Sequence, residues 1–119
     1  MSESLYERLG GTRGITQIAN DLVDIHLSNP AIATRFTNSN TDNLKKGAAA
    51  FFISATGGPQ VYEGKDMLET HRGMNISEHE FLATLDDVLK TLQQNNVGQR
   101  EQEEALFALY SMKSDIVLV

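Results

Sequence analysis

The sequence of 119 residues contains no cysteine. Disulfide bonds, thiolate nucleophiles and sulfur-ligated zinc sites are therefore excluded, and the lack of disulfides is compatible with a reducing compartment. With sulfur ligands removed, a buried histidine becomes the best metal ligand that the chain can offer.

Basic residues are also scarce. The chain has ten Lys and Arg and sixteen Asp and Glu, so its net charge is −6. Such a chain suits nucleic acid poorly, since phosphate contacts need clustered cations. No stretch approaches the roughly 20 apolar residues that span a bilayer, and residues 1–4 lack the basic start of a signal peptide. We expect a soluble cytoplasmic protein with no nucleic-acid or membrane partner.

Apolar residues make up 40% of the chain, which is enough to bury a core and one large ligand as well. The length is that of one domain and no internal repeat interrupts it. We therefore predict a single domain over residues 1–119, present as a monomer or weak dimer.

Helix signals run through the whole chain. The capping boxes that begin at Ser4 and Ser77 predict two helix starts, and Thr12 is a candidate N-cap for another helix. Further helices are expected over about residues 42–55, 65–72 and 99–113. No run alternates apolar and polar residues as a half-buried strand does. The predicted fold class is therefore all-α, and the apolar tail over residues 115–119 is expected to extend or to dock.

Residues 57–71 carry the strongest functional signal. Gly57-Gly58 ends a helix, a loop follows, and a short amphipathic segment presents His71 with Met67 one turn before it. His71 taken alone could be an ordinary core or surface histidine. Aromatic residues that could flank a flat ligand occur elsewhere in the chain, at Phe36, Phe51 and Phe52.

One imidazole between apolar walls is a poor zinc site, because zinc needs three or four ligands. The same arrangement suits haem, since the porphyrin supplies four nitrogens and the protein supplies one axial imidazole. No C-x-x-C-H motif is present, so we expect non-covalent haem b. The ligating nitrogen must be unprotonated, and the other ring N–H usually donates to a carbonyl.

The wider pattern resembles the group I truncated haemoglobins, the short two-over-two globins. The resemblance covers about residues 4–116. It rests on Leu5-Tyr6-Glu7-Arg8-Leu9-Gly10-Gly11, on Phe36, on Phe51-Phe52 and Gly57-Gly58-Pro59, on Tyr62-x-Gly64-x-x-Met67-x-x-x-His71, and on Ile76 to Phe81. This family implies a two-over-two helical sandwich that encloses a haem.

Carried across residue by residue, the resemblance implies that His71 is the proximal iron ligand and that Phe36 stacks on the haem. Lys45 and Lys46 lie near where the family places a cation for the haem propionates, although a solvated helix face explains them equally well. The remaining implied pocket residues are Leu44, Ala48, Phe51, Phe52, Tyr62, Met67, Ile76, Phe81, Thr84, Val88 and Leu109.

The distal side departs from the family pattern. Val23 stands where relatives carry a tyrosine, and Leu44, Gly47 and Ala48 stand where they carry a glutamine or another donor. Losing a hydrogen bond to bound O₂ costs on the order of 1–3 kcal/mol, or roughly 5- to 150-fold in affinity. We therefore predict weak, fast-dissociating O₂ and easy oxidation, with carbon monoxide less affected.

Two residues could compensate for the missing hydrogen-bond donor on the distal side. His26 lies one turn beyond Val23 on an apolar stripe, as either a satisfied core residue or a group that reaches the iron or hydrogen-bonds a ligand or water. Thr84 is the other, although a helical threonine can bond its own backbone. His79 is expected at the surface. Small residues over 47–50 favour either a gas tunnel or a close helix contact.

The leading hypothesis is a haem protein that binds O₂, CO or NO reversibly. Turnover competes with it, since bound O₂ would oxidise NO to nitrate with an unidentified reductase as partner. The alternative from another class is a haem-free interaction or sensory domain in which His71 is unused. Peroxidase-like activity would need His26 as its acid–base residue.

Overall fold

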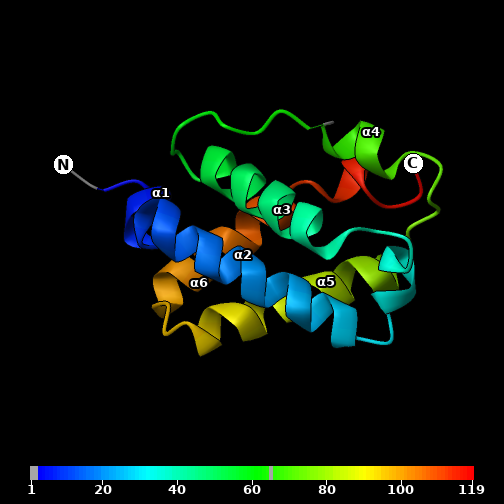
Figure 1. Ribbon diagram of the computed structural model, residues 1–119, viewed down its shortest axis with the longest axis horizontal. Coiled ribbons are helices and arrows are strands. Elements are labelled where there is room, and N and C mark those ends of the chain that lie inside the picture. Colours follow the sequence, from blue (N-terminus) through cyan, green and yellow to red (C-terminus); the bar gives the residue numbers. More distant parts are fainter. Residues whose placement is uncertain (1–2, 65) are drawn as a thin grey trace.

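The computed structural model describes residues 3–64 and 66–119, which form helices and no strands (Figure 1). This confirms the all-α prediction. The elements of the described residues are α1 Leu5–Arg8, α2 Gly11–Ser28, η1 Ala33–Phe36, α3 Thr41–Ala55, α4 Met67–His71, α5 Glu78–Gln94, α6 Gln99–Tyr110 and η2 Lys113–Asp115.

The helices form two pairs. Helix α2 packs against α3, helix α5 packs against α6, and α2 joins the two pairs by crossing α5. The long connection from α3 to α4 runs along the outer side of α3, and α4 lies beside η2 (Figure 1). This is the two-over-two sandwich that the sequence predicted. Within the described ranges, no helix is long and apolar enough to cross a bilayer.

The core where the two pairs meet is a cluster of four buried aliphatic residues. Ile18 and Leu22 come from α2, and Val88 and Leu92 come from α5. Burying such a side chain contributes about 1.5–3 kcal/mol. The cluster joins the two layers, and two of its members, Leu22 and Val88, also line the cavity described below.

Both predicted capping boxes are confirmed. Ser4 Oγ accepts from the Glu7 backbone N–H at 3.2 Å, and Ser77 Oγ accepts from the Glu80 backbone N–H at 3.1 Å. In return, the Ser77 N–H donates to the Glu80 carboxylate at 3.0 Å. These pairs satisfy orphan donors at the two helix starts, as the motif requires.

The prediction that Thr12 caps the second helix is wrong. Gly10, at φ 99°, is the N-cap, and α2 begins at Gly11. The left-handed backbone of Gly10 turns the chain before Thr12 is reached, and the Thr12 hydroxyl instead lies 2.6 Å from the Tyr6 hydroxyl.

Other boundaries shift by smaller amounts. Helix α3 begins at Thr41, because Asn40 accepts from the Asn43 N–H at 3.0 Å. Helix α6 ends at Tyr110 and a 3₁₀ turn follows. The helix predicted over residues 65–72 is confined to α4, and Lys65 lies outside the described residues.

The apolar tail docks. The Leu118 N–H donates to the Ile76 carbonyl at 3.0 Å, and the Gly73 N–H donates to the Val119 carbonyl at 3.0 Å. These bonds hold the segment that follows α4 against the C-terminal residues.

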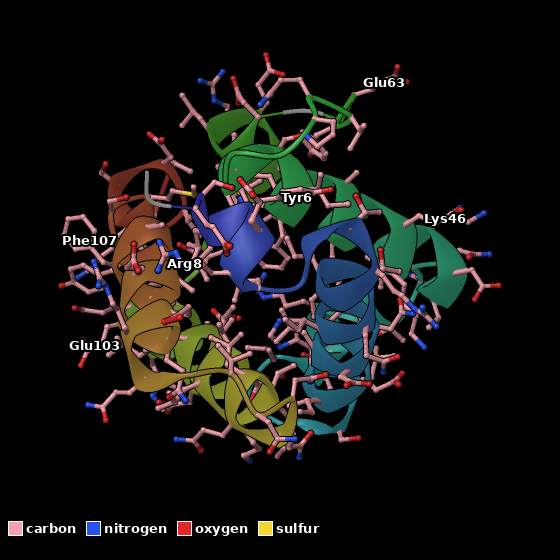
Figure 2. All side chains as sticks on the ribbon, turned by 90° about the vertical axis from the view of Figure 1, so that its left-hand side faces the viewer. Tyr6, Arg8, Lys46, Glu63, Glu103 and Phe107 are labelled. Carbon is pink, nitrogen blue, oxygen red and sulfur yellow. The ribbon has the colours of Figure 1, made fainter. Side chains whose placement is uncertain are left out.

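The first helix ties two distant elements together (Figure 2). The Tyr6 N–H donates to the Thr56 carbonyl at 2.9 Å just after α3, and Arg8 forms a bidentate pair with Glu104 of α6. A side chain at Gly58 would overlap with the Tyr6 ring, so this glycine permits the close approach.

We expect Gly14→Ala to destabilise the protein by about 1–3 kcal/mol, because its methyl group would overlap with the Leu9 carbonyl oxygen. Urea unfolding of the haem-loaded protein measures this. Gly98→Ala is the control, because its methyl would lie 3.6 Å from the Glu101 carboxylate, and it should cost less than about 1 kcal/mol. Equal stability of the two variants would contradict the packing argument.

Candidate functional site

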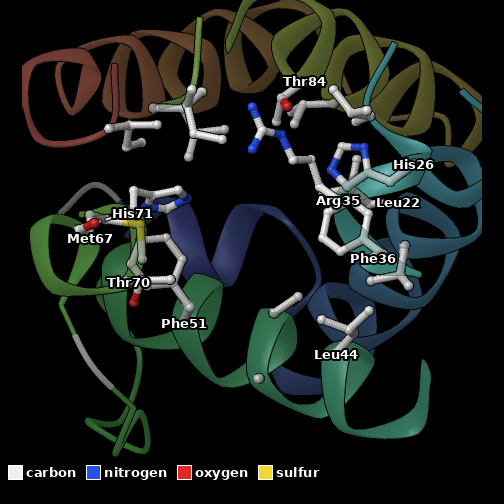
Figure 3. A pocket seen from close by; sticks show the side chains of 18 of the residues that line it. Leu22, His26, Arg35, Phe36, Leu44, Phe51, Met67, Thr70, His71 and Thr84 are labelled. Carbon is white, nitrogen blue, oxygen red and sulfur yellow. Dashed lines mark hydrogen bonds between the residues drawn. The ribbon is translucent and has the colours of Figure 1, made fainter. Parts of the chain in front are cut away.

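A cavity of about 430 Å³ opens between the two helix pairs (Figure 3). This volume lies within the roughly 300–1,000 Å³ of small-molecule and cofactor sites. Most of the wall is apolar. The residues that line it are Leu22, Val23, His26, Leu27, Ile32, Arg35, Phe36, Asn43, Leu44, Gly47, Ala48, Phe51, Phe52, Tyr62, Met67, Thr70, His71, Met74, Ile76, Glu80, Phe81, Thr84, Leu85, Val88, Leu109, Met112 and Ile116.

His71 ends the short helix α4 and forms one wall together with Met67 (Figure 3). The Asp66 side chain caps this helix by accepting from the Glu69 N–H at 2.8 Å. His71 Nδ1 lies 2.8 Å from the Met67 carbonyl oxygen. A carbonyl oxygen can only accept, so Nδ1 carries the proton. Nε2 is therefore the nitrogen with a lone pair, as a metal-ligating histidine requires.

Aromatic rings form a second part of the wall. Phe51 meets Phe52 edge-on at 5.6 Å between ring centroids, and it meets Tyr62 edge-on at 5.5 Å. On the opposite side, Phe36 is stacked with His26 at 6.0 Å and an interplanar angle of 7°. The rings fix one another in orientation, which keeps the cavity open for a rigid ligand.

The residues at the predicted distal positions supply no hydrogen-bond donor. Val23, Leu44, Gly47 and Ala48 all line the cavity, and none has a polar side chain. Thr84 also lines it, but its hydroxyl donates to the Glu80 carbonyl at 3.1 Å. Its proton is therefore committed to the helix backbone.

His26 is both a satisfied residue and a cavity residue. Its Nδ1 lies 2.7 Å from the carboxylate of Asp87, and the ring lines the cavity wall. The contact with Asp87 agrees with the interpretation as a satisfied residue, and a contact of His26 with the iron, a ligand or water stays a prediction. His79, in contrast, is exposed as expected.

The cavity also contains an ion pair that the sequence did not suggest. Arg35 contacts both carboxylate oxygens of Glu80, at 2.6 and 2.8 Å, and donates to the Met74 carbonyl at 2.7 Å. Hydrogen bonding from Arg35, followed by the Ser77 backbone N–H, lowers the pKa of Glu80 to about 2. Arg35 thereby fastens the segment after α4 to the start of α5.

The two lysines considered for the propionates lie outside the wall. Lys45 pairs with Asp24 at 3.0 Å, and Lys46 is exposed on the outer side of α3 (Figure 2). Their contact with a cofactor stays a prediction. All other predicted pocket residues line the cavity.

Sequence reasoning missed several lining residues: Leu22, Leu27, Ile32, Arg35, Asn43, Thr70, Met74, Glu80, Leu85, Met112 and Ile116. Leu22, Leu85 and Met112 had a signal, because each is an apolar residue within a predicted helix. Ile116 had none, since it follows the last predicted helix.

A second, smaller cavity of about 40 Å³ lies towards α1. Its wall is almost entirely apolar, and five of its residues also line the large cavity: Leu22, Phe52, Val88, Leu109 and Met112. None of the small residues over 47–50 lines this smaller cavity, so the gas tunnel considered from those residues stays a prediction.

Comparisons with known proteins agree on one family. The family model for the bacterial-like globins matches residues 4–117. A group 1 truncated haemoglobin from Synechocystis is 31% identical over 102 residues, which cover 81% of each chain. One from Tetrahymena pyriformis is 27% identical over 115 residues, covering 97% of this chain and 95% of that one.

Solved structures show the same fold. The Fe(III) form of truncated haemoglobin from Tetrahymena pyriformis superposes with a TM-score of 0.94 at 26% identity, covering 98% of this chain and all of that one. The chain therefore belongs to the bacterial-like globins and, within them, to the group I truncated haemoglobins.

Haem b is the cofactor of this class, and the cavity fits it. The wall offers the His71 imidazole with Nε2 free, flat aromatic neighbours and apolar side chains. Among the described residues, no three His, Asp or Glu side chains could hold a metal ion on their own. A metal at His71 thus needs most of its ligands from a macrocycle.

The lowered pKa of Glu80 predicts a pH dependence of stability. Because the folded-state pKa of about 2 lies below the ordinary 4.5, its contribution is present above pH 4.5 and lost as pH falls towards 2. Glu80→Gln removes this charge while keeping a capping-box residue. The variant should be less stable than the parent at pH 7, with the gap closing as the pH is lowered in urea unfolding. Glu63→Gln, at an exposed position, should show no such convergence.

Proposed function

We propose that this protein binds O₂, CO or NO at a haem whose iron is held by His71 Nε2. One observation carries the proposal: the 2.8 Å contact from His71 Nδ1 to the Met67 carbonyl, which leaves Nε2 unprotonated in an apolar cavity. Bound haem supplies an iron with one open coordination position for a gas. Phe36 and Phe51 lie on opposite sides of the cavity and would hold the ring from its faces or edges (Figure 3).

The apolar distal residues determine what kind of gas binding we expect. Val23, Leu44 and Ala48 make this side of the cavity apolar and offer nothing that hydrogen-bonds to an oxygen carrying partial negative charge. Such a site should bind CO well and O₂ weakly. Reversible binding or sensing therefore fits this wall better than long-term O₂ storage.

Oxidation of NO to nitrate is the second candidate function. It needs two small molecules in one protein, and the small cavity adjoining the large one offers an apolar space for the second. Consumption of NO by the reduced protein under air, with a reductase supplied, distinguishes turnover from simple binding.

The proximal assignment is tested by His71→Ala. We expect the variant to lose haem retention and the Soret band of the parent, because no other histidine is placed to replace His71 on its side of the cavity. His79→Gln is the matched control and should keep the parent spectrum, since His79 is exposed. An unchanged ferrous and CO-bound spectrum in His71→Ala would overturn the proposal.

The proposal that the apolar distal residues weaken O₂ binding is tested by Leu44→Gln, which places an amide donor in the cavity wall. Dissociation of O₂ should slow by roughly 5- to 150-fold, the equivalent of about 1–3 kcal/mol for one hydrogen bond. Stopped-flow measurement of O₂ release reports it. Leu44→Met changes the shape without adding a donor and should leave the rate near that of the parent. An equally slow rate in the methionine variant would show that bulk, rather than hydrogen bonding, is responsible.

A further inference from the structure

Ser54 lies in the last turn of α3, and its side chain bonds forward to the connection that leads to α4. Its Oγ accepts from the Val61 N–H and from the Tyr62 N–H, each at 3.1 Å, and it donates to the Pro59 carbonyl at 3.4 Å. A serine hydroxyl has one proton to donate and two lone pairs with which to accept. All three are used on residues 59–62, so the hydroxyl serves the connection rather than its own helix.

Other helical hydroxyls in this protein bond differently. The Ser28 hydroxyl, at the end of α2, donates to the Asp24 carbonyl at 3.2 Å, and the Thr84 hydroxyl donates to the Glu80 carbonyl at 3.1 Å. Both bond the backbone one turn earlier, which is the ordinary choice of Ser and Thr within helices. Ser54 departs from this choice, so its hydroxyl contributes bonds to the connection and not to the helix.

Backbone groups strengthen the same attachment. The Gln60 side-chain amide donates to the Ser54 carbonyl at 3.2 Å, and the Gly58 N–H donates to the Ile53 carbonyl at 3.0 Å. Residues 58–62 have no helix or strand of their own, and the connection runs along α3 (Figure 1). The bonds to the end of α3 therefore decide the course of the chain here.

The attached segment places the ring of Tyr62, which lines the cavity and meets Phe51 of α3 edge-on at 5.5 Å between centroids. Gly64 also approaches this ring, so closely that a methyl group at Gly64 would overlap with it. The ring is thus fixed by Phe51 and by the connection itself. A shift of the connection away from Ser54 would carry Tyr62 out of the cavity wall.

Resting on the haem binding proposed above, we propose that Ser54 is a positioning residue of the cofactor cavity. It holds the connection against α3 so that Tyr62 closes the wall beside Phe51. Ser54 is not among the residues that line the cavity, so its effect on the cofactor passes through Tyr62. Val61 is 48% exposed, which shows that water reaches this segment. Without the hydroxyl, the freed N–H groups bond to water, and the wall loosens while the fold survives.

Transfer of haem to excess apomyoglobin measures how firmly the cavity keeps the cofactor. Ser54→Ala should lose haem about 5- to 50-fold faster than the parent, which is the order expected for two lost hydrogen bonds. Ser54→Thr keeps the hydroxyl and should stay near the parent rate. Ser28→Ala is the matched control, because it removes a hydroxyl that bonds its own helix, and it should leave haem loss unchanged. A parent rate in Ser54→Ala would contradict the role of Ser54.

A double-mutant cycle separates positioning through Tyr62 from a general loss of stability. Tyr62→Ala should by itself speed haem loss, because it removes part of the wall. If Ser54 acts through Tyr62, the double variant Ser54→Ala/Tyr62→Ala should lose haem no faster than Tyr62→Ala alone. Two effects that multiply in the double variant would show that Ser54 acts independently and would sink the proposal.

Amide hydrogen exchange, followed by NMR of the CO-bound ferrous protein, tests the two bonds to Ser54 directly. The Val61 and Tyr62 amides lie outside helices and strands, yet they should be protected in the parent. Ser54→Ala should speed their exchange by about tenfold or more and leave the amide of Leu92, in the core of α5, unchanged. Unprotected Val61 and Tyr62 amides in the parent would overturn the proposal, whether or not a variant folds.

The two proposals fail separately. If the parent takes up no haem, the gas-binding function fails, and amide exchange in the haem-free protein still tests the bonds to Ser54. If haem uptake depends on His71 while haem loss is the same with and without the Ser54 hydroxyl, only the role of Ser54 fails.

Discussion

The structure depends on keeping a cavity of about 430 Å³ open between two helix pairs. Apolar side chains that face a gap lose the packing contacts that a filled core would give them. A cofactor that fills the gap restores these contacts and removes the apolar wall from water. The cofactor is therefore part of the hydrophobic core, and the protein without it should be far less stable.

Polar contacts hold the walls of the cavity in place. Arg35 joins η1 to the start of α5 and to the segment after α4, while Asp87 joins α5 to α2 through His26. Helices α2 and α5 also pack directly through Leu22 and Val88, so the His26–Asp87 pair adds a polar contact to an apolar one.

Much of the fold was predictable because its signals are local. The capping boxes at Ser4 and Ser77 each lie within a single helix, and both are found where expected. The short α4 and its histidine were also predictable, through the loop before it and the family pattern. The prediction for Thr12 is wrong because Gly10 caps the helix two residues earlier. The left-handed backbone of Gly10 cannot be read from composition alone.

Contacts between residues far apart in the sequence could not be predicted. His26 and Asp87 are 61 residues apart, and Arg35 and Glu80 are 45 apart. Neither pair has a periodic or spacing signal. The partner of His26 therefore remained unknown until the helices were placed, although the residue itself had been singled out.

The docked tail has a consequence for how such a protein can change. Backbone bonds join Leu118 to Ile76 and Val119 to Gly73 in the segment directly after His71, so the position of this imidazole depends partly on residues that do not line the cavity. Natural variation or engineering at this remote end could tune how tightly the prosthetic group is retained while the pocket itself stays unaltered.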